Sequence, residues 1–290
     1  MTSTTTAFLA VSQNLSRYQT MTATEPAVKT AAAYYEANIG SVKSIQDLVG
    51  NYRLLSYALN AYDLGDQINA KGLITKVLEG GVTNPKSLAN TLPNSQWKAF
   101  AAAFNFVDSG AAPPSSASAV ATTASDYVEQ QLESDQGDQD VGVQLALYFQ
   151  RVAPTVASEL GILADPNLLE VAATIMGLPP AVASSLQPQT LSELMPVSDL
   201  QDPAKLKQLT ERFTAMYDAT YGPGTGATSS LTVDSGNSSS GPSGAAAVLA
   251  SVISSNGLAL GSAFNDFTGA SQPIFSTALM SSISRLTLGG

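Results

Sequence analysis

The stretch YYEANIGSVKSIQDLVGNYRLLSYALNAYDL, residues 34–64, determines the class of fold. It predicts two helices with a tight connection, and Gly40 stands where the first helix would need a left-handed closing residue. The second helix is expected to begin at Ser44. The hydroxyl of Ser44 can accept the amide N–H of Asp47, while the Asp47 carboxylate can accept the amide N–H of Ser44. This reciprocal capping box predicts the start of a helix from local sequence.

An apolar stripe follows the capping box at the period of an α-helix. Its members recur at steps of three and four residues: Ile45, Leu48, Tyr52, Leu55, Leu59 and Tyr62. Such spacing puts large apolar side chains on one helix face, which must then pack against other helices. Apart from SSLTV around Leu231, no stretch alternates as a β-strand does. The sequence therefore predicts an all-α fold, a multi-helix globular domain flanked by N- and C-terminal amphipathic helices.

Several blocks of the chain resemble one protein family, in the same order along the sequence. The blocks are YYEANIGSVKSIQDLVGNYRLLSYALNAYDLGD, VLEGGVTNPKSLANTL, WKAFAAAFNF, VGVQLALYFQRVAPTVASELGILADPNLLEVAATIMGLP and DLQDPAKLKQLTERFTAMYD, which span about residues 27–217. The family is an uncharacterised all-helical domain of alphaproteobacteria, a domain of unknown function whose members are often encoded among flagellar genes. The resemblance implies an all-helical fold and a flagellar setting. It implies no activity.

The composition argues against several classes of partner. Only 12% of the residues are charged, against about 25% in ordinary proteins, and this neutral surface suits either an assembly or an Ala-rich genome. The net charge of −10 and the scattered basic residues argue against nucleic acid. No apolar run reaches the ~20 residues of a membrane helix. The N-terminus lacks the basic start of a secretory signal peptide, so any export would occur without a cleaved signal.

The chain contains neither cysteine nor histidine. Without cysteine there is no disulfide, thiolate nucleophile or zinc–thiolate site. Without histidine the commonest general base and transition-metal ligand are missing. We therefore expect no enzyme activity, no cofactor, no metal and no small-molecule substrate. Only carboxylate chemistry, such as a glycosidase pair, remains open as a distant alternative.

Composition breaks predict the domain organisation. Residues 1–24 are expected to form an N-terminal amphipathic helix, and residues 25–221 an all-helical globular domain with a loop or hinge at 110–118. Residues 222–244 are rich in Gly, Ser and Thr, which is typical of a flexible linker. Residues 245–290 are expected to form a C-terminal helical segment.

The two ends carry the predicted interaction residues. At the N-terminal end Phe8, Val11, Leu15 and Tyr18 mark one narrow, heptad-like face. At the C-terminal end the corresponding stripe is Phe275, Leu279, Ile283 and Leu286. Both stripes are nearly free of charge, which favours packing against a neighbouring helix. The expected partners are other copies of the chain or flagellar axial proteins, without nucleic acid or membrane insertion.

Few residues offer recognisable chemistry. The acidic run DQGDQD, with Asp135, Asp138 and Asp140, resembles a calcium loop, but Ala146 stands where the bidentate glutamate should be. A solvated helix boundary is the simpler interpretation. Trp97, the only tryptophan, is expected to anchor the core or its boundary. The pairs Asp47–Arg53 and Glu211–Arg212 are interpreted as ordinary charges on helix surfaces. GPGTGATS at residues 222–229 lacks the lysine of a phosphate-binding loop.

Two functions remain open from the sequence. The first is a structural or assembly component of the bacterial flagellum, whose terminal helices self-associate or dock to axial subunits. The motif Asn-Leu-Ala-Asn, typical of many rod and hook subunits, is absent, which leaves a capping or associated role open. The second is a cytoplasmic helical binding module, or chaperone-like accessory factor, in flagellar assembly.

Overall fold

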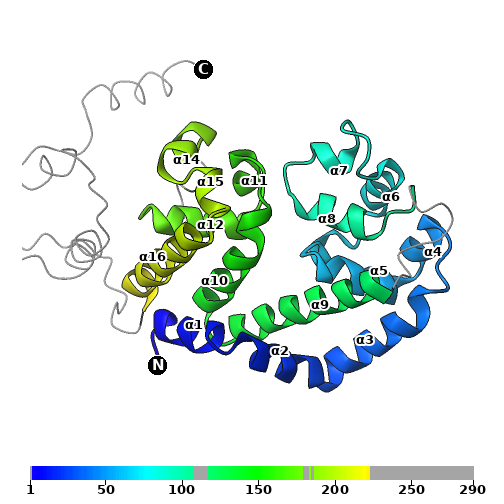
Figure 1. Ribbon diagram of the computed structural model, residues 1–290, viewed down its shortest axis with the longest axis horizontal. Helices are drawn as coiled ribbons and strands as arrows, with labels where there is room; N and C mark the ends of the chain where they lie inside the picture. The colour runs from blue at the N-terminus through cyan, green and yellow to red at the C-terminus, as the bar shows by residue number, and fades with distance from the viewer. Residues whose placement is uncertain (1, 108–116, 179–182, 184–185, 223–290) are drawn as a thin grey trace, which may run out of the picture. The chain divides into compact units, whose positions relative to one another are not determined.

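The computed structural model describes residues 2–107, 117–178, 183 and 186–222. Over these ranges the chain consists of α-helices and two short 3-10 helices, with no strand (Figure 1). The predicted all-α, multi-helix globular fold is confirmed. No helix within the described ranges is long and apolar enough to cross a membrane.

The helices of the first half have the following bounds: α1 (Thr4–Ser12), α2 (Leu15–Thr24), α3 (Pro26–Ile39), α4 (Ile45–Gly50), α5 (Tyr52–Ala61), the 3-10 helix η1 (Gly65–Gln67), α6 (Lys71–Gly80), α7 (Leu88–Thr91) and α8 (Gln96–Ala103). Those of the second half are α9 (Ala117–Gly137), α10 (Val141–Val152), the 3-10 helix η2 (Ala153–Thr155), α11 (Glu159–Leu163), α12 (Pro166–Ile175), α14 (Pro188–Leu194), α15 (Val197–Leu200) and α16 (Pro203–Tyr221).

The stretch 34–64 contains the predicted capping box but one more helix than predicted. Ser44 and Asp47 cap each other's backbone N–H groups at the start of α4. The helix stops at Gly50, and Asn51 begins α5 by accepting the N–H of Leu54 through its side chain. This break turns the following residues, so that Tyr52, predicted to join the buried stripe, is 65% exposed.

One other backbone prediction in this region, the left-handed Gly40, was wrong. Gly40 ends α3 in the right-handed region, with φ −64°. The left-handed residue of the region is Asp63, with φ 55°. An aspartate tolerates this conformation better than most residues do. The carboxylate of Asp63 accepts a hydrogen bond from Arg151.

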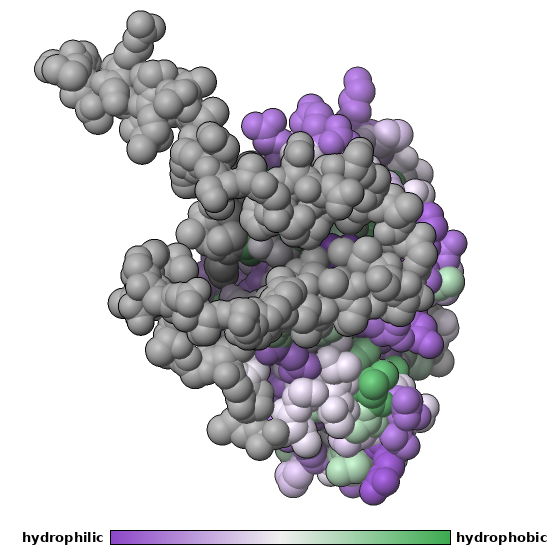
Figure 2. All heavy atoms as spheres, turned by 90° about the vertical axis from the view of Figure 1, so that its left-hand side faces the viewer, coloured by the Kyte–Doolittle hydropathy of each residue, from purple (hydrophilic) through white to green (hydrophobic). Residues whose placement is uncertain are grey.

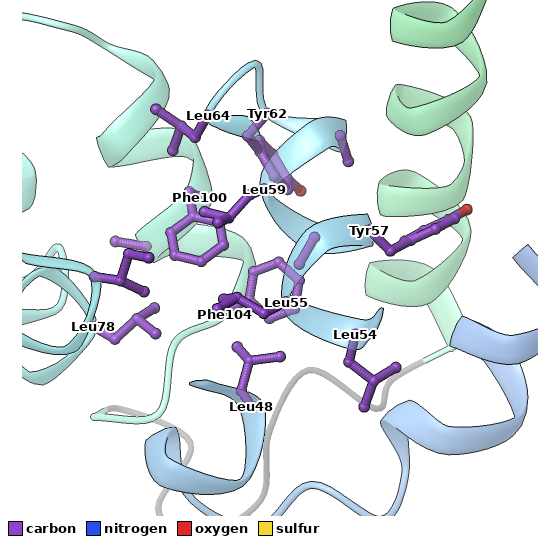
Figure 3. Packing of buried hydrophobic residues seen from close by; sticks show 14 of the residues in the cluster. Leu48, Leu54, Leu55, Tyr57, Leu59, Tyr62, Leu64, Leu78, Phe100 and Phe104 are labelled. Carbon is purple, nitrogen blue, oxygen red and sulfur yellow. The ribbon is translucent and has the colours of Figure 1, made fainter. Parts of the chain in front are cut away.

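A first buried cluster lies among α3 to α6, α8 and the start of α9. Figure 3 shows the rings of Phe100 and Phe104 beside Leu59 and Leu55 of α5. Trp97 is also buried here, as predicted. The larger members of this first cluster are Tyr35, Ile39, Leu48, Leu54, Leu55, Tyr57, Leu59, Tyr62, Ile74, Leu78, Trp97, Phe100, Phe104 and Tyr127.

A second buried cluster lies among α1, α10, α11, α12 and α14 to α16. Pro154 interrupts the helix before it, since α10 ends at Val152 and the chain continues as η2. Asp165 and Asp202 are N-caps, and the side chain of each accepts two N–H groups of the helix that it starts. The larger members of this second cluster are Phe8, Val11, Val143, Leu145, Leu147, Tyr148, Phe149, Val152, Ile162, Leu168, Val171, Ile175, Leu191, Leu200, Leu206 and Phe213.

Helix α9 contacts elements of both clusters. It packs against both α5 and α10, and it also touches α2 and α3 (Figure 1). Tyr127 of α9 stacks on Tyr57, with ring centroids 4.0 Å apart, and Tyr57 stacks in turn on Tyr35. Through α9, residues far apart in sequence belong to one packed unit.

The N-terminal residues do not stand apart from this unit. The single N-terminal helix expected over residues 1–24 is interrupted between Ser12 and Leu15, which gives α1 and α2. The start of α1 is held by α16, because the Asp218 carboxylate accepts the backbone N–H groups of Thr4 and Thr5 at 2.6 and 3.0 Å. A carboxylate at a helix N-terminus is favoured by the helix dipole as well.

The prediction that Phe8 and Val11 face a neighbouring molecule therefore needs correction. Each is only 3% exposed, and both belong to the second cluster of their own chain. Burying apolar area is favourable whichever surface covers it, and here α10 and α16 lie within reach. The loop predicted at 110–118 falls mostly outside the described residues. The linker from residue 223 and the stripe of Phe275, Leu279, Ile283 and Leu286 fall outside them entirely.

Candidate functional site

The main group of buried charges lies around Arg151, the one charged residue of α10. Its Nε and Nη2 donate to the two carboxylate oxygens of Glu133 on α9, each at 2.7 Å, and Nη2 also donates to Asp63 at 2.9 Å. Such two-pronged pairing suits the planar guanidinium. The side chains of Arg151, Asp63 and Glu133 are 20%, 13% and 7% exposed. The group joins α10, α9 and the end of α5.

Two further residues extend this group toward α12. The Tyr148 hydroxyl donates to the Asp165 carboxylate at 2.5 Å, while the other oxygen of Asp165 accepts the N–H groups of Asn167 and Leu168. The Arg151 guanidinium lies 5.5 Å from the centre of the Tyr148 ring, within the range of a cation–π contact. We call Asp63, Glu133, Tyr148, Arg151 and Asp165 the arginine cluster.

The arginine cluster contains more acidic side chains than basic ones. Burial raises the pKa of Glu133 to about 7, although its pair with Arg151 acts in the opposite direction. Burial likewise raises the pKa of Asp63 despite Arg151, and it raises the pKa of nearby Asp126 to about 6, with help from Glu129. For Arg151, burial lowers the pKa, but the carboxylates outweigh it and the pKa rises. Arg151 is thus a single cation that pairs with two carboxylates, those of Glu133 and Asp63.

An apolar pocket lies beside the arginine cluster. It has a volume of about 380 Å³ and lies where α2, α9, α10 and α16 meet, at the small end of the usual range for ligand pockets. Glu133 and Arg151 form part of its wall, together with Glu129, Gln150 and Lys207. Its remaining wall is apolar: Leu15, Leu132, Leu147, Pro203 and Leu206. The shape and lining suit one or two apolar side chains.

The predicted N-terminal interaction residues divide between core and pocket. Phe8 and Val11 are buried, as described above, and Tyr18 is half-buried against the second cluster. Leu15 is 38% exposed and lines the pocket. Of these four residues, only Leu15 is both exposed and part of the pocket wall.

The other residues considered from the sequence have local structural roles. Asp140 starts α10 by accepting two backbone N–H groups, and it accepts the Thr4 hydroxyl at 2.8 Å. Asp47 belongs to the capping box, and Arg53 lies over the Tyr34 ring, 3.7 Å from its centre. Over the described ranges, no group of three or more acidic side chains is arranged to hold a metal ion.

Sequence reasoning missed the arginine cluster. The available signal was Arg151 itself, because VGVQLALYFQRV contains one charge in an otherwise mostly apolar helix. A charge in such a helix requires a buried partner. The sequence does not reveal that Asp63, 88 residues earlier, supplies part of it.

A family model described as protein of unknown function, DUF1217, matches residues 61–206. The chain belongs to the DUF1217 family. All five members of the arginine cluster lie inside the matched range. The resemblance to a domain of unknown function is therefore confirmed.

A crystal structure of a protein from Agrobacterium tumefaciens is similar to this DUF1217 protein. The two are 36% identical, and the TM-score is 0.67. The similarity covers 73% of this chain and 92% of the Agrobacterium chain. No curated protein matches the chain. The similar structure comes from an alphaproteobacterium, as the resemblance of the sequence blocks implied.

Proposed function

We propose that this DUF1217 protein is a structural or assembly component of the bacterial flagellum that acts by binding other proteins through helical surfaces. The observation that carries the binding role is the apolar pocket, with Leu15 exposed beside it. Exposed apolar side chains next to a recess are typical of sites where a partner inserts its own side chains. The flagellar setting rests on the family, whose members are often encoded among flagellar genes.

A role in binding also fits the state of the buried charges. Glu133 and Asp63 are both hydrogen-bonded to Arg151, so both carboxylates take part in holding helices together. The arginine cluster thus ties three helical elements together. We therefore propose that the protein is not an enzyme and that its arginine cluster stabilises the fold around the pocket.

Exposed apolar side chains also occur outside the pocket. Leu9 and Met21, on α1 and α2, are 38% and 53% exposed. Figure 2 shows green apolar residues standing among purple polar ones where the surface is drawn in colour. Single exposed apolar residues are common on protein surfaces, so the pocket carries the argument for binding and these residues do not.

One observation favours a second candidate function. Axial subunits pair their terminal helices with those of neighbours, whereas here Phe8 and Val11 are already buried in the chain's own core. This arrangement favours a cytoplasmic accessory factor, with a chaperone-like or docking role in flagellar assembly. Export without a cleaved signal peptide belongs to the first candidate alone.

Cell fractionation distinguishes the two candidates. A tagged full-length chain is followed in sheared, purified flagella, in basal bodies and in cytoplasm, with a known cytoplasmic protein as the purity control. Co-purification with flagella or basal bodies supports the structural component. Recovery from cytoplasm alone, together with a motility defect in the deletion strain, supports the accessory factor. Normal flagella and motility in that strain would reject both.

A further inference from the structure

An open hollow lies among the end of α3, α4 and the start of α5, and it shares no residue with the apolar pocket. Its volume is about 680 Å³, within the usual range for ligand pockets. Its wall contains the rings of Tyr34 and Tyr52 and two charged side chains, Asp47 and Arg53. We call it the tyrosine–arginine hollow. A wall with both aromatic rings and charge can select a ligand by its chemistry as well as by its shape.

The ring of Tyr34 is held in place by the fold. Its neighbour Tyr35 is buried and stacks on Tyr57, with ring centroids 4.5 Å apart, so this part of α3 is tied to the first cluster. The Tyr34 hydroxyl accepts a hydrogen bond from the side-chain amide of Asn51 at 3.3 Å, and Asn51 also starts α5. The ring thus has a defined position before a ligand binds, which reduces the entropy that binding has to overcome.

Arg53 places a positive charge against this ring. Its guanidinium carbon lies 3.7 Å from the centre of the Tyr34 ring, within the range of a cation–π contact. A guanidinium that stacks by its face keeps its N–H groups at its edge, where their planar arrangement matches a carboxylate. Over the described ranges, no carboxylate forms an ion pair with Arg53. The guanidinium can therefore pair with a carboxylate of another molecule.

The other charged groups around the hollow have partners within the chain. The Asp47 carboxylate accepts the backbone N–H groups of Lys43 and Ser44, each at 2.9 Å, as part of the capping box. The Lys43 ammonium donates to the Gly40 carbonyl at 2.7 Å. Residues 40–53 contain two cations and one carboxylate, whereas the whole chain has a net charge of −10. This surface is thus positive in a chain that is otherwise acidic, which favours a negatively charged ligand.

Tyr52 adds exposed aromatic area next to this charge. It is 65% exposed, and it lines the hollow together with Arg53, the next residue of α5. Tyrosine and arginine are enriched among the residues that contribute most to binding at protein interfaces. One ligand can therefore contact the ring of Tyr52 and the guanidinium of Arg53 at the same time.

We propose that the tyrosine–arginine hollow binds an acidic segment of a partner protein. A carboxylate of this segment pairs with the edge of the Arg53 guanidinium, and a neighbouring aromatic or aliphatic side chain packs on Tyr52. A nucleic acid fits less well, because the wall contains a single cation and binding to a phosphate backbone requires several. The proposal concerns a surface other than the apolar pocket and holds whether or not the protein belongs to a flagellum.

Binding of short model peptides to the full chain tests this proposal. The probe is the acetylated and amidated peptide Glu-Glu-Phe-Glu-Glu. The matched probes are Lys-Lys-Phe-Lys-Lys, Glu-Glu-Ala-Glu-Glu and a single-stranded octamer of thymidine. Amide NMR shifts of the isotope-labelled chain locate the binding and measure its affinity. At about 0.15 M salt the Debye length is about 8 Å, which limits the repulsion between the acidic chain and the acidic peptide.

We expect Glu-Glu-Phe-Glu-Glu to shift the amides of residues 41–54 and to bind more tightly than the other three probes. Arg53→Gln should weaken this binding at least about tenfold, because a charge-assisted pair is lost. Tyr52→Ala should reduce the affinity for the phenylalanine peptide to that for the alanine peptide. The matched control Arg17→Gln removes the same charge from an exposed position on α2 and should leave the affinities unchanged.

Both replaced residues of the hollow are exposed, so their variants keep the fold, and circular dichroism checks this. The absence of binding by the acidic peptide would overturn the proposal. Tighter binding of the basic peptide or of the thymidine octamer would overturn it too, as would equal effects of Arg53→Gln and Arg17→Gln.

Discussion

At the scale of single residues, Arg151 is the cation that pairs with the buried carboxylates of Glu133 and Asp63. It neutralises Glu133 and Asp63 at contact distances of 2.7 and 2.9 Å. Buried ion pairs contribute little relative to apolar substitutes, but removing one partner leaves the other charge unpaired. Through the arginine cluster, one residue of α10 thus pairs with a carboxylate on α9 and with another in the turn after α5.

Replacing that residue should destabilise the protein strongly. We expect Arg151→Leu to lower the free energy of unfolding by about 3–5 kcal/mol, because two carboxylates lose their cation. Chemical denaturation followed by circular dichroism measures the change. Lys205→Met removes the exposed pair with Asp199 and should leave the denaturation midpoint nearly unchanged. Equal effects of the two variants would contradict the assigned role of Arg151.

The pKa of Glu133 predicts a pH dependence of stability. Burial raises it to about 7 from an ordinary value of 4.5, so between these values the folded state binds the proton more strongly than the unfolded state. The contribution of Glu133 is thus fully present below pH 4.5 and is lost as the pH rises through 7. Other carboxylates titrate in the same range, so a comparison with a variant is needed.

Denaturation midpoints measured from pH 4.5 to pH 8 for the natural chain and Glu133→Gln provide that comparison. Because the amide does not titrate, the natural chain should lose stability relative to Glu133→Gln as the pH rises. A difference between the two that is constant with pH, or that changes in the opposite direction, would show that Arg151 keeps Glu133 ionised throughout.

At the scale of elements, helices are started by aspartate caps that differ in burial. Asp202 caps α16 at the surface, whereas Asp165 caps α12 in the core and also accepts the Tyr148 hydroxyl. Asp165→Ala should cost about 1 kcal/mol for the cap and roughly 1–3 kcal/mol more for the orphaned hydroxyl. Asp202→Ala should cost about 1 kcal/mol. Thermal unfolding of the two variants measures the difference, and equal losses would count against the role of the Tyr148 contact.

The position of α1 gives a second prediction for an element. Because Phe8 is 3% exposed in the second cluster, Phe8→Ala should cost about 3–5 kcal/mol of unfolding free energy. Leu9→Ala, at the neighbouring position that is 38% exposed, should cost much less. If Phe8→Ala kept full stability and only weakened association with a partner, the N-terminal stripe would be a docking surface after all.

At the scale of the whole molecule, α9 makes the two buried clusters depend on each other. Its Tyr127 stacks in the first cluster, and its Glu133 pairs with Arg151 beside the second. Neither cluster can lose α9 without exposing part of its own surface. We therefore expect the described helices to unfold together.

Trp97 allows this to be measured, because the only tryptophan of the chain lies in the first cluster. Its fluorescence reports on that cluster, while far-ultraviolet circular dichroism reports on all helices. The two signals should give the same midpoint in urea. Separate midpoints would show that the clusters unfold as independent units, and in that case Arg151→Leu should affect them unequally.

The sequence by itself determined the features that depend on neighbouring residues. The capping box of Ser44 and Asp47, the aspartate caps before Pro166 and Pro203, and the interruption at Pro154 all follow from hydrogen bonds or steric limits within about four residues. Helical periodicity then led to the all-α fold, and the order of the sequence blocks led to the family. These signals are present in any short window of the chain.

Only the tertiary structure decided which surface each apolar or charged residue meets. The left-handed Asp63 could not be predicted from its neighbours, because its partner Arg151 lies 88 residues away. The same holds for Phe8, since a narrow apolar stripe is equally suited to another molecule and to α10 and α16 of its own chain. Burial is favourable wherever apolar area leaves water, so packing in three dimensions, and not local pattern, selects the partner.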